Sequence, residues 1–257
     1  MSFFYRLGQN PVKLFIVAQI LILLAFIWRD FPIFIFFAFA PVFALIDHPT
    51  GLKDSYLAFL VAIGISLVLY YTMQQSRVIS WVIYFILLAG IFASYIFIQR
   101  FTQYKLNKFT LIIFILGMEY LLLKFMINNN PVFLADLLGP KITWTRWNIF
   151  TGYTGATFWI LLTNLLFYHA LFKNEKIKWP FLIVGILMIV VPLVYSLTLT
   201  YTALTKGDII NFYSIHSEYD SVGYFQHGEL ISRTGAWVSV LIIIFTLVKG
   251  KTKKVSR

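Results

Sequence analysis

Eight long apolar segments, separated by short polar stretches, constrain this chain more than any other feature of its sequence. A helix that crosses a bilayer needs about 20 predominantly apolar residues, because each residue advances it by roughly 1.5 Å. The segments predict an all-α fold, a polytopic membrane bundle of about eight transmembrane helices in a single domain over residues 1–257. Their predicted bounds are Pro11–Trp28, Phe31–Ile46, Tyr56–Met73, Val78–Ile98, Phe109–Ile127, Asn148–Phe172, Pro180–Ala203 and Leu230–Val248.

The composition agrees with this class. The chain is 60% hydrophobic and 12% charged, whereas a soluble domain is about half apolar and about a quarter charged. It has no cysteine, which excludes disulfides, thiolate metal sites and a cysteine nucleophile. A formal charge of +11 would indicate nucleic acid as the partner of a soluble protein. Here the cations lie in short loops and a tail, so we expect them to set the topology and expect no nucleic-acid partner.

The distribution of lysine and arginine predicts the orientation. With the N-terminus in the cytoplasm, most of these residues fall on the cytoplasmic side, including Lys173, Lys176, Lys178 and the tail 249–257. This is the positive-inside pattern, and an even number of spans then places both termini in the cytoplasm. The two longest loops, 128–147 and 204–229, are expected on the external face.

The entrance to the sixth segment has the chemistry of a membrane–water interface. Aromatic rings sit at headgroup depth, and cations beside them can meet a phosphate. Two glycines three residues apart allow another backbone or a lipid tail to come close. The candidate lipid-binding residues are Lys141, Trp144, Arg146, Trp147, Gly152, Tyr153 and Gly155.

Two polar residues within the apolar segments are expected to be structural. Glu119 is a carboxylate in an apolar helix, where an unpaired charge is costly and is usually paired or functional. Lys124 and Arg146 are the partners considered for it. Asn164 is expected to hydrogen-bond between helices rather than to contact a ligand.

The second outer loop offers a different chemistry. His216, Glu218, His227 and Glu229 are residue types that bind zinc or perform acid–base hydrolysis. Neither His-x-Glu pair has the i, i+4 spacing of a helical metal site, and no His-Glu-x-x-His motif is present. We therefore predict no metal site and no cofactor, and keep these four residues as weak candidates only.

Four motifs stand in order along the chain. They are RDFPIFIFFAFAPVFALIDH around Pro41, Gly117–Leu121, Thr151–Gly155 with Phe158–Asn164, and Tyr224–Arg233. Each resembles a signature of the membrane domain of the bacterial apolipoprotein N-acyltransferases, and their order and spacing suit eight spans. The resemblance implies a multi-pass protein of the bacterial inner membrane, with phospholipid or lipoprotein acyl chains as its partners.

One departure from that family decides the expected function. The family inserts a nitrilase-like domain with a Glu-Lys-Cys catalytic triad between its last two helices. Here the interval 204–229 is too short for such a domain, and the chain has no cysteine. We expect no catalytic residue in this chain, and predict a non-catalytic acyltransferase-like protein that binds lipid or lipoprotein acyl chains. Other envelope membrane proteins are its candidate protein partners.

Two alternatives remain open. In the first, the chain is the membrane subunit of a split apolipoprotein N-acyltransferase whose nitrilase-like chain is separate. In the second and weaker one, it is a metal-dependent membrane hydrolase that uses His216 and His227.

Overall fold

The computed structural model describes residues 3–27, 32–47, 78–102, 106–125, 133–138, 148–202 and 222–255. Every regular element in these ranges is a helix, which confirms the predicted all-α class. The predicted segment 56–73 lies outside the described residues, so the number of eight spans remains a prediction.

The helical elements have the following bounds. The longer helices are α2 (Pro11–Ile27), α6 (Val78–Thr102), α7 (Lys108–Phe125), α9 (Asn148–Phe167), α10 (Trp179–Thr202) and α12 (Val222–Val255). The shorter elements are α1 (Phe3–Gly8), the 3-10 turn η1 (Pro32–Phe34), α3 (Ile35–Ala38), α4 (Ala40–Asp47), the 3-10 turn η4 (Leu134–Leu138) and the π-helical turn η5 (Tyr168–Phe172).

Three of these helices are long and apolar enough to cross a membrane: Thr154–Phe172, Trp179–Leu197 and Leu230–Val248. They differ sharply in burial. In the first, 72% of the apolar window is buried, against 17% in each of the other two. The helix α9 is therefore an inner helix, whereas α10 and α12 expose apolar side chains over most of their surface, as helices do that contact lipid.

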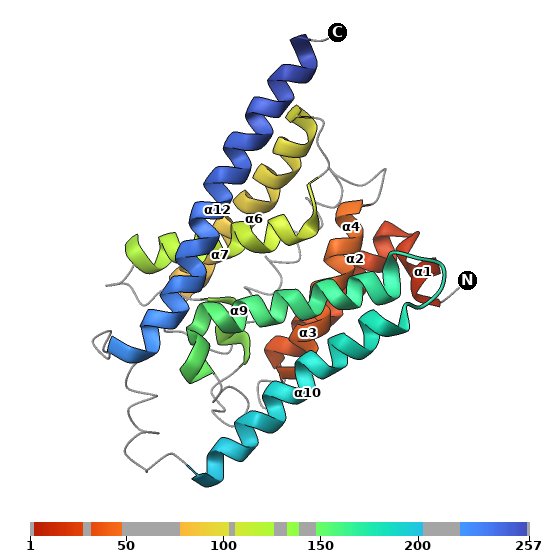
Figure 1. The fold of residues 1–257 in the computed structure, drawn as a ribbon. Coiled ribbons are helices and arrows are strands. Elements are labelled where there is room, and N and C mark those ends of the chain that lie inside the picture. The colour runs from red at the N-terminus through yellow and green to blue at the C-terminus, as the bar shows by residue number, and fades with distance from the viewer. Residues whose placement is uncertain are drawn as a thin grey trace.

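The helix α9 lies at the centre of the described bundle. It contacts α10, α12, α7, α3, α4 and η4. Figure 1 shows α10 folding back beside α9 in the opposite direction, while α12 crosses α7 and extends beyond it. The short α1 packs near the far end of α9, where the Phe4 and Phe172 ring centroids are 6.1 Å apart.

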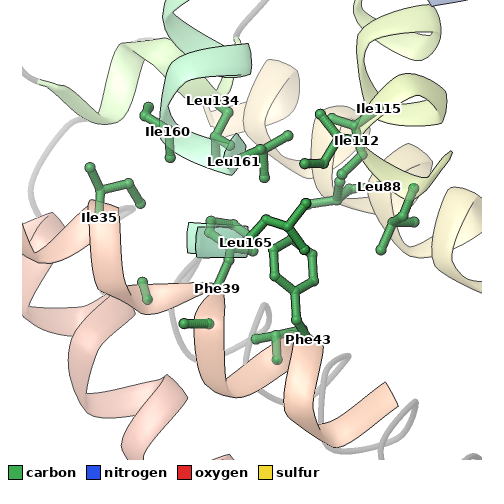
Figure 2. Close-up of a cluster of buried hydrophobic side chains, with 14 of the residues drawn as sticks. Ile35, Phe39, Phe43, Leu88, Ile112, Ile115, Leu134, Ile160, Leu161 and Leu165 are labelled. Atoms are coloured by element: carbon green, nitrogen blue, oxygen red, sulfur yellow. The ribbon is translucent and has the colours of Figure 1, made fainter. Parts of the chain in front are cut away.

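The apolar core joins α9 to the N-terminal elements and to α6 and α7. Figure 2 shows Phe39 and Phe43 of the N-terminal segment facing Leu165 of α9. Leu88 and Ile112 close the cluster from α6 and α7. Each of these side chains is buried. Burial of a large apolar side chain contributes about 1.5–3 kcal/mol in water, so this cluster fixes the mutual positions of the elements.

The predicted segment Phe31–Ile46 is interrupted in the structure. It consists of η1, α3 and α4, with Phe39 between the last two. Pro41 lies one residue into α4 and explains the break, because proline has no backbone N–H and its ring clashes with the carbonyl four residues earlier, here that of Phe37.

The predicted external loop 128–147 enters the bundle. Its described part, residues 133–138, forms η4, and the side chains of Phe133, Leu134, Ala135 and Leu138 are buried. Contacts with α9 cover this turn. Irregular backbone is tolerated at membrane depth when protein surrounds it, and the sequence reading missed this because the apolar residues here are too few for a span.

A small-residue crossing joins α7 to α12. A Cβ atom added at Gly117 would lie 3.1 Å from Ala236 Cα and 3.1 Å from Ser239 Oγ. One added at Gly235 would lie 3.0 Å from Leu116 Cβ. Ser239 Oγ donates a hydrogen bond to the Ile113 carbonyl across the interface at 3.2 Å. Glycine and serine permit this close approach, which drives helix association in lipid.

Gly117→Val is therefore expected to destabilise the bundle by about 1–3 kcal/mol, since the added methyl groups overfill a tight contact. Gly90→Val, in α6, is the matched control because nothing lies within 4 Å of its added Cβ. Thermal unfolding of the full chain in mild detergent measures both. Equal effects of the two substitutions would show that the crossing is not tight.

Candidate functional site

Asn164 joins α9 to the broken N-terminal segment. Its side chain is fully buried, and Oδ1 accepts hydrogen bonds from the backbone N–H groups of Phe39 (2.8 Å) and Ala40 (3.0 Å). Nδ2 donates to the Ile35 carbonyl at 2.8 Å. In an unbroken helix, the Phe39 N–H would bond to the Ile35 carbonyl and the Ala40 N–H to the Phe36 carbonyl. One amide therefore satisfies the backbone that the break at Pro41 leaves open.

Trp159 acts in the same way on α10. Pro192 lies within α10 and lacks the N–H that would bond to the carbonyl of Met188, four residues earlier. The indole N–H of Trp159 donates to that carbonyl. Its ring also packs on Phe36, with centroids 4.4 Å apart. Asn164 and Trp159 lie within about one and a half turns of α9. Together they satisfy backbone groups next to a proline in each of two neighbouring elements.

Glu119 brings four elements together. The side chain is fully buried in α7. Its Oε1 accepts hydrogen bonds from Tyr84 Oη of α6 (2.9 Å), Thr157 Oγ1 of α9 (3.0 Å) and the backbone N–H of Leu134 in η4 (3.1 Å). Hydrogen bonds to a carboxylate are stronger than those between neutral groups. This carboxylate therefore fastens the buried turn η4 to three helices.

The two cations considered as partners of Glu119 have different positions. Lys124 is exposed, and its Nζ lies 5.7 Å from the centroid of the Tyr120 ring. Arg146 lies outside the described residues. The partners of Glu119 include two hydroxyls and one backbone amide.

A third polar cluster lies at the other end of α9. Lys108 Nζ and Asp47 Oδ1 form an ion pair at 2.5 Å, and Tyr168 Oη donates to the second oxygen of Asp47. Lys108 also lies over the Tyr168 ring, 5.1 Å from its centroid. Tyr168 opens the π-helical turn η5. Such turns are rare and change the direction of side chains relative to the α-helix before them.

Burial of Lys108 lowers the pKa of its ammonium below the ordinary value of 10.5, and the nearby Asp47 opposes that effect. This residue precedes the apolar segment that begins at Phe109. Because the folded chain releases the proton at a lower pH than the unfolded chain, the free energy of unfolding is expected to rise as the pH increases from the lowered pKa towards 10.5.

Lys108→Met is expected to remove that rise with pH. Melting temperatures of the full chain in detergent at pH 7 to 10 measure it, with Lys124→Met, which alters an exposed lysine of the same helix, as the control. The same pH dependence in all three proteins would contradict the assignment.

The predicted lipid-binding residues are only partly within the described chain. Lys141, Trp144, Arg146 and Trp147 lie outside it, just before α9. The backbone of Gly152 and Tyr153 lies in the first turns of α9. Gly155 is buried, half a turn before Thr157. The structure thus places three of the seven at the start of the central helix.

The weak metal candidates are not brought together by the described chain. His216 and Glu218 lie outside it, and His227 and Glu229 lie in the first turns of α12, where only the backbone is described. Within the described ranges, no group of three or more His, Cys, Asp or Glu residues has the arrangement of a metal site.

The residues of these clusters that were missed from the sequence include Trp159, Tyr168, Asp47, Lys108, Tyr84 and Thr157. A signal for Trp159 was present, because Pro192 predicts an orphaned carbonyl four residues before it and a neighbouring donor to satisfy it. Asp47 and Tyr168 are distant in sequence, and nothing in the sequence pairs them.

Comparison of the chain with protein-family models, with curated proteins and with solved structures gives no significant match. No match identifies the acyltransferase family, so the resemblance remains an expectation from the sequence.

Proposed function

We propose that this chain is a non-catalytic, acyltransferase-like protein of the bacterial inner membrane that holds lipid or lipoprotein acyl chains at the external entrance of α9. The entrance is the segment Trp144–Gly155. Arg146, with Lys141 just before the entrance, would meet the headgroup phosphate. The two tryptophans would lie at headgroup depth, and the two glycines would admit the acyl chain. The protein would work with other membrane proteins of the envelope.

The observation that carries this proposal is the division of α9 into two parts. From Thr157 onwards, the helix bonds to other elements through Thr157, Trp159, Asn164 and Tyr168. The entrance precedes all four of these anchors. A rigidly held helix that carries two glycines, Gly152 and Gly155, in its first turns is suited to binding, because a preorganised site loses little conformational entropy when a ligand binds.

The outward faces of the neighbouring helices support the same proposal. Val191 and Val194 of α10 and Trp237 and Leu241 of α12 are among the exposed large apolar side chains. Both helices contact α9. An acyl chain that enters at the start of α9 would therefore pass from lipid that already contacts its neighbours.

Three helix ends that meet in the structure support the proposed orientation. The end of α4, the start of α7 and the end of α9 meet in the contacts among Asp47, Lys108 and Tyr168. The predicted topology assigns all three to the cytoplasmic side, with both chain termini. If the spans did not alternate as predicted, these three residues would be assigned to opposite sides of the membrane.

The test is mass spectrometry of the lipids and proteins that copurify with the full chain in mild detergent. We expect specific lipids or lipoproteins to be enriched, and expect Gly155→Leu to reduce that enrichment about tenfold, corresponding to about 1.4 kcal/mol. Gly90→Leu is the matched control, because that site is open. Arg146→Gln is a second variant that leaves the described core intact.

Two results would overturn the proposal. One is wild-type protein without enrichment; the other is enrichment that neither entrance variant changes. Copurification of a separate nitrilase-like chain would instead favour the split acyltransferase.

A further inference from the structure

The turn between α9 and α10 gathers positive charge. Lys173, Lys176 and Lys178 are exposed within it, with one acid, Glu175, beside them. The turn is closed by a hydrogen bond from the Lys178 backbone N–H to the Ala170 carbonyl at 3.0 Å. Its cations are therefore held on an ordered backbone rather than on a loose loop.

Other positive groups lie close to this turn. Lys173 is near enough to Lys108 to oppose its charge electrostatically. The charges of Lys173, Lys108 and Lys178 also act on the imidazole of His169, and Asp47 opposes them. Asp47 is itself paired with Lys108. The net charge at this end of α9 is therefore positive, and the unneutralised charges are those of Lys173 and Lys178.

A buried hydrogen-bond donor lies in the same turn. The Nδ2 atom of Asn174 is buried and has no hydrogen-bond partner. Buried polar groups are nearly always hydrogen-bonded, because a donor without a partner loses its hydration and gains nothing. A donor next to the cation Lys173 is suited to an anionic oxygen.

The surface next to the turn is aromatic and apolar. Trp179 is 62% exposed. Phe181 stacks on His169 with ring centroids 5.5 Å apart, and Lys178 Nζ lies 6.0 Å from the centroid of Phe181. Beyond them, Ile183 and Leu187 are exposed along α10. This order, with cations first, then aromatic rings, then aliphatic side chains, follows the order of phosphate, glycerol and acyl chain in a phospholipid.

We propose that Lys173, Asn174 and Lys178 bind the phosphate of an anionic phospholipid, whose acyl chains lie along the exposed face of α10. The continuous apolar face selects a lipid over a free phosphate ion. This site is distinct from the entrance of α9, because the 20 residues of that helix separate the two by about 30 Å. It lies in the opposite leaflet and does not depend on the proposed function.

Native mass spectrometry of the delipidated full chain tests the site, by titration with phosphatidylglycerol and, separately, with phosphatidylcholine. We expect phosphatidylglycerol to bind more tightly. Lys173→Gln and Lys178→Gln are each expected to weaken it about fivefold, which corresponds to about 1 kcal/mol per cation near a lipid surface. Asn174→Asp is nearly isosteric and is expected to weaken it at least as much, since its carboxylate repels the phosphate.

Lys253→Gln, in the C-terminal part of α12, is the matched control because it removes the same charge elsewhere. Three results would overturn the proposal. They are equal binding of the two lipids, undiminished phosphatidylglycerol binding by all three variants, and an equal loss of binding in the control. Millimolar inorganic phosphate that binds the lipid-free chain as tightly as the lipid does would assign a soluble anion instead. Far-ultraviolet circular dichroism checks that each variant is folded, and Gly155→Leu should leave this site unchanged.

Discussion

Asn164→Leu is expected to lower the free energy of unfolding by about 3 kcal/mol, one of the largest losses from any single substitution in the described bundle. Leucine is similar in size but has no polar group. Two backbone N–H groups and the Ile35 carbonyl would lose their partners within apolar surroundings. Each buried group left unsatisfied costs about 1–3 kcal/mol. Averages within membrane bundles are nearer 0.6 kcal/mol per bond, but here three backbone groups lose the same side-chain partner together.

Thr163→Val is the matched control for Asn164→Leu. Thr163 is equally buried and lies beside Asn164, but its hydroxyl donates only to the Trp159 carbonyl within the same helix. We expect its loss to cost less than about 1 kcal/mol. Equilibrium unfolding of both variants in mixed detergent gives the difference, and similar costs would contradict the role of Asn164.

A double substitution makes the test sharper. If Asn164 compensates for the break at Pro41, then in a Pro41→Ala background a continuous helix can satisfy its own backbone. Asn164→Leu should then cost less than it does in the wild type. Strict additivity of the two substitutions would show that they act independently.

Glu119→Leu is expected to lower the free energy of unfolding by about 2 kcal/mol. The hydroxyls of Tyr84 and Thr157 can rotate towards other acceptors, whereas the Leu134 N–H is fixed in the turn η4 and would be left without its carboxylate partner. Loss of Glu119 should therefore loosen η4 more than the rest of the bundle.

Glu119→Gln is the control for this prediction, because its side-chain oxygen keeps the acceptor position that serves all three donors. We expect it to cost less than about 1 kcal/mol. Hydrogen–deuterium exchange at residues 133–138 measures the local effect. Faster exchange in the leucine variant alone is the expected result; unchanged exchange in that variant would show that Glu119 does not hold the turn.

The sequence predicted the helices where hydrophobic length is the deciding quantity. The starts of α2 at Pro11 and of α6 at Val78 coincide with the predicted segments. The ends of α12 did not: it begins at Val222 and continues to Val255, because polar residues extend a helix beyond the apolar core of a bilayer. Length alone gives no signal for such extensions.

The internal joints of the bundle were not predictable in the same way. The segment Phe31–Ile46 was predicted as continuous although proline disfavours a helix interior. Nothing local shows that Asn164, more than a hundred residues away, bonds to the backbone at the break. The burial of η4 depends on tertiary contacts with Glu119 and with the surface of α9. For the candidate site, composition and the positions of aromatic and cationic residues carry the prediction, and these identify an interface without identifying its ligand.

The two ends of α9 have different roles under the proposed function. One end is fixed to α4 and α7 through Asp47, Lys108 and Tyr168. The other end begins at Asn148 and carries Gly152 and Gly155 in its first turns. Under the proposed function, the fixed end keeps the helix in place while the entrance receives an acyl chain.

Photo-crosslinking tests the central claim most directly, namely that the entrance of α9 holds an acyl chain. The full chain would be incubated in nanodiscs with a phospholipid that carries a diazirine on its acyl chain, irradiated, digested and analysed by mass spectrometry. We expect labels concentrated in Trp144–Gly155, and we expect excess unlabelled lipid and Gly155→Leu to reduce them. Labels confined to the exposed faces of α10 and α12, and unaffected by competitor, would show only surrounding lipid and would contradict this claim.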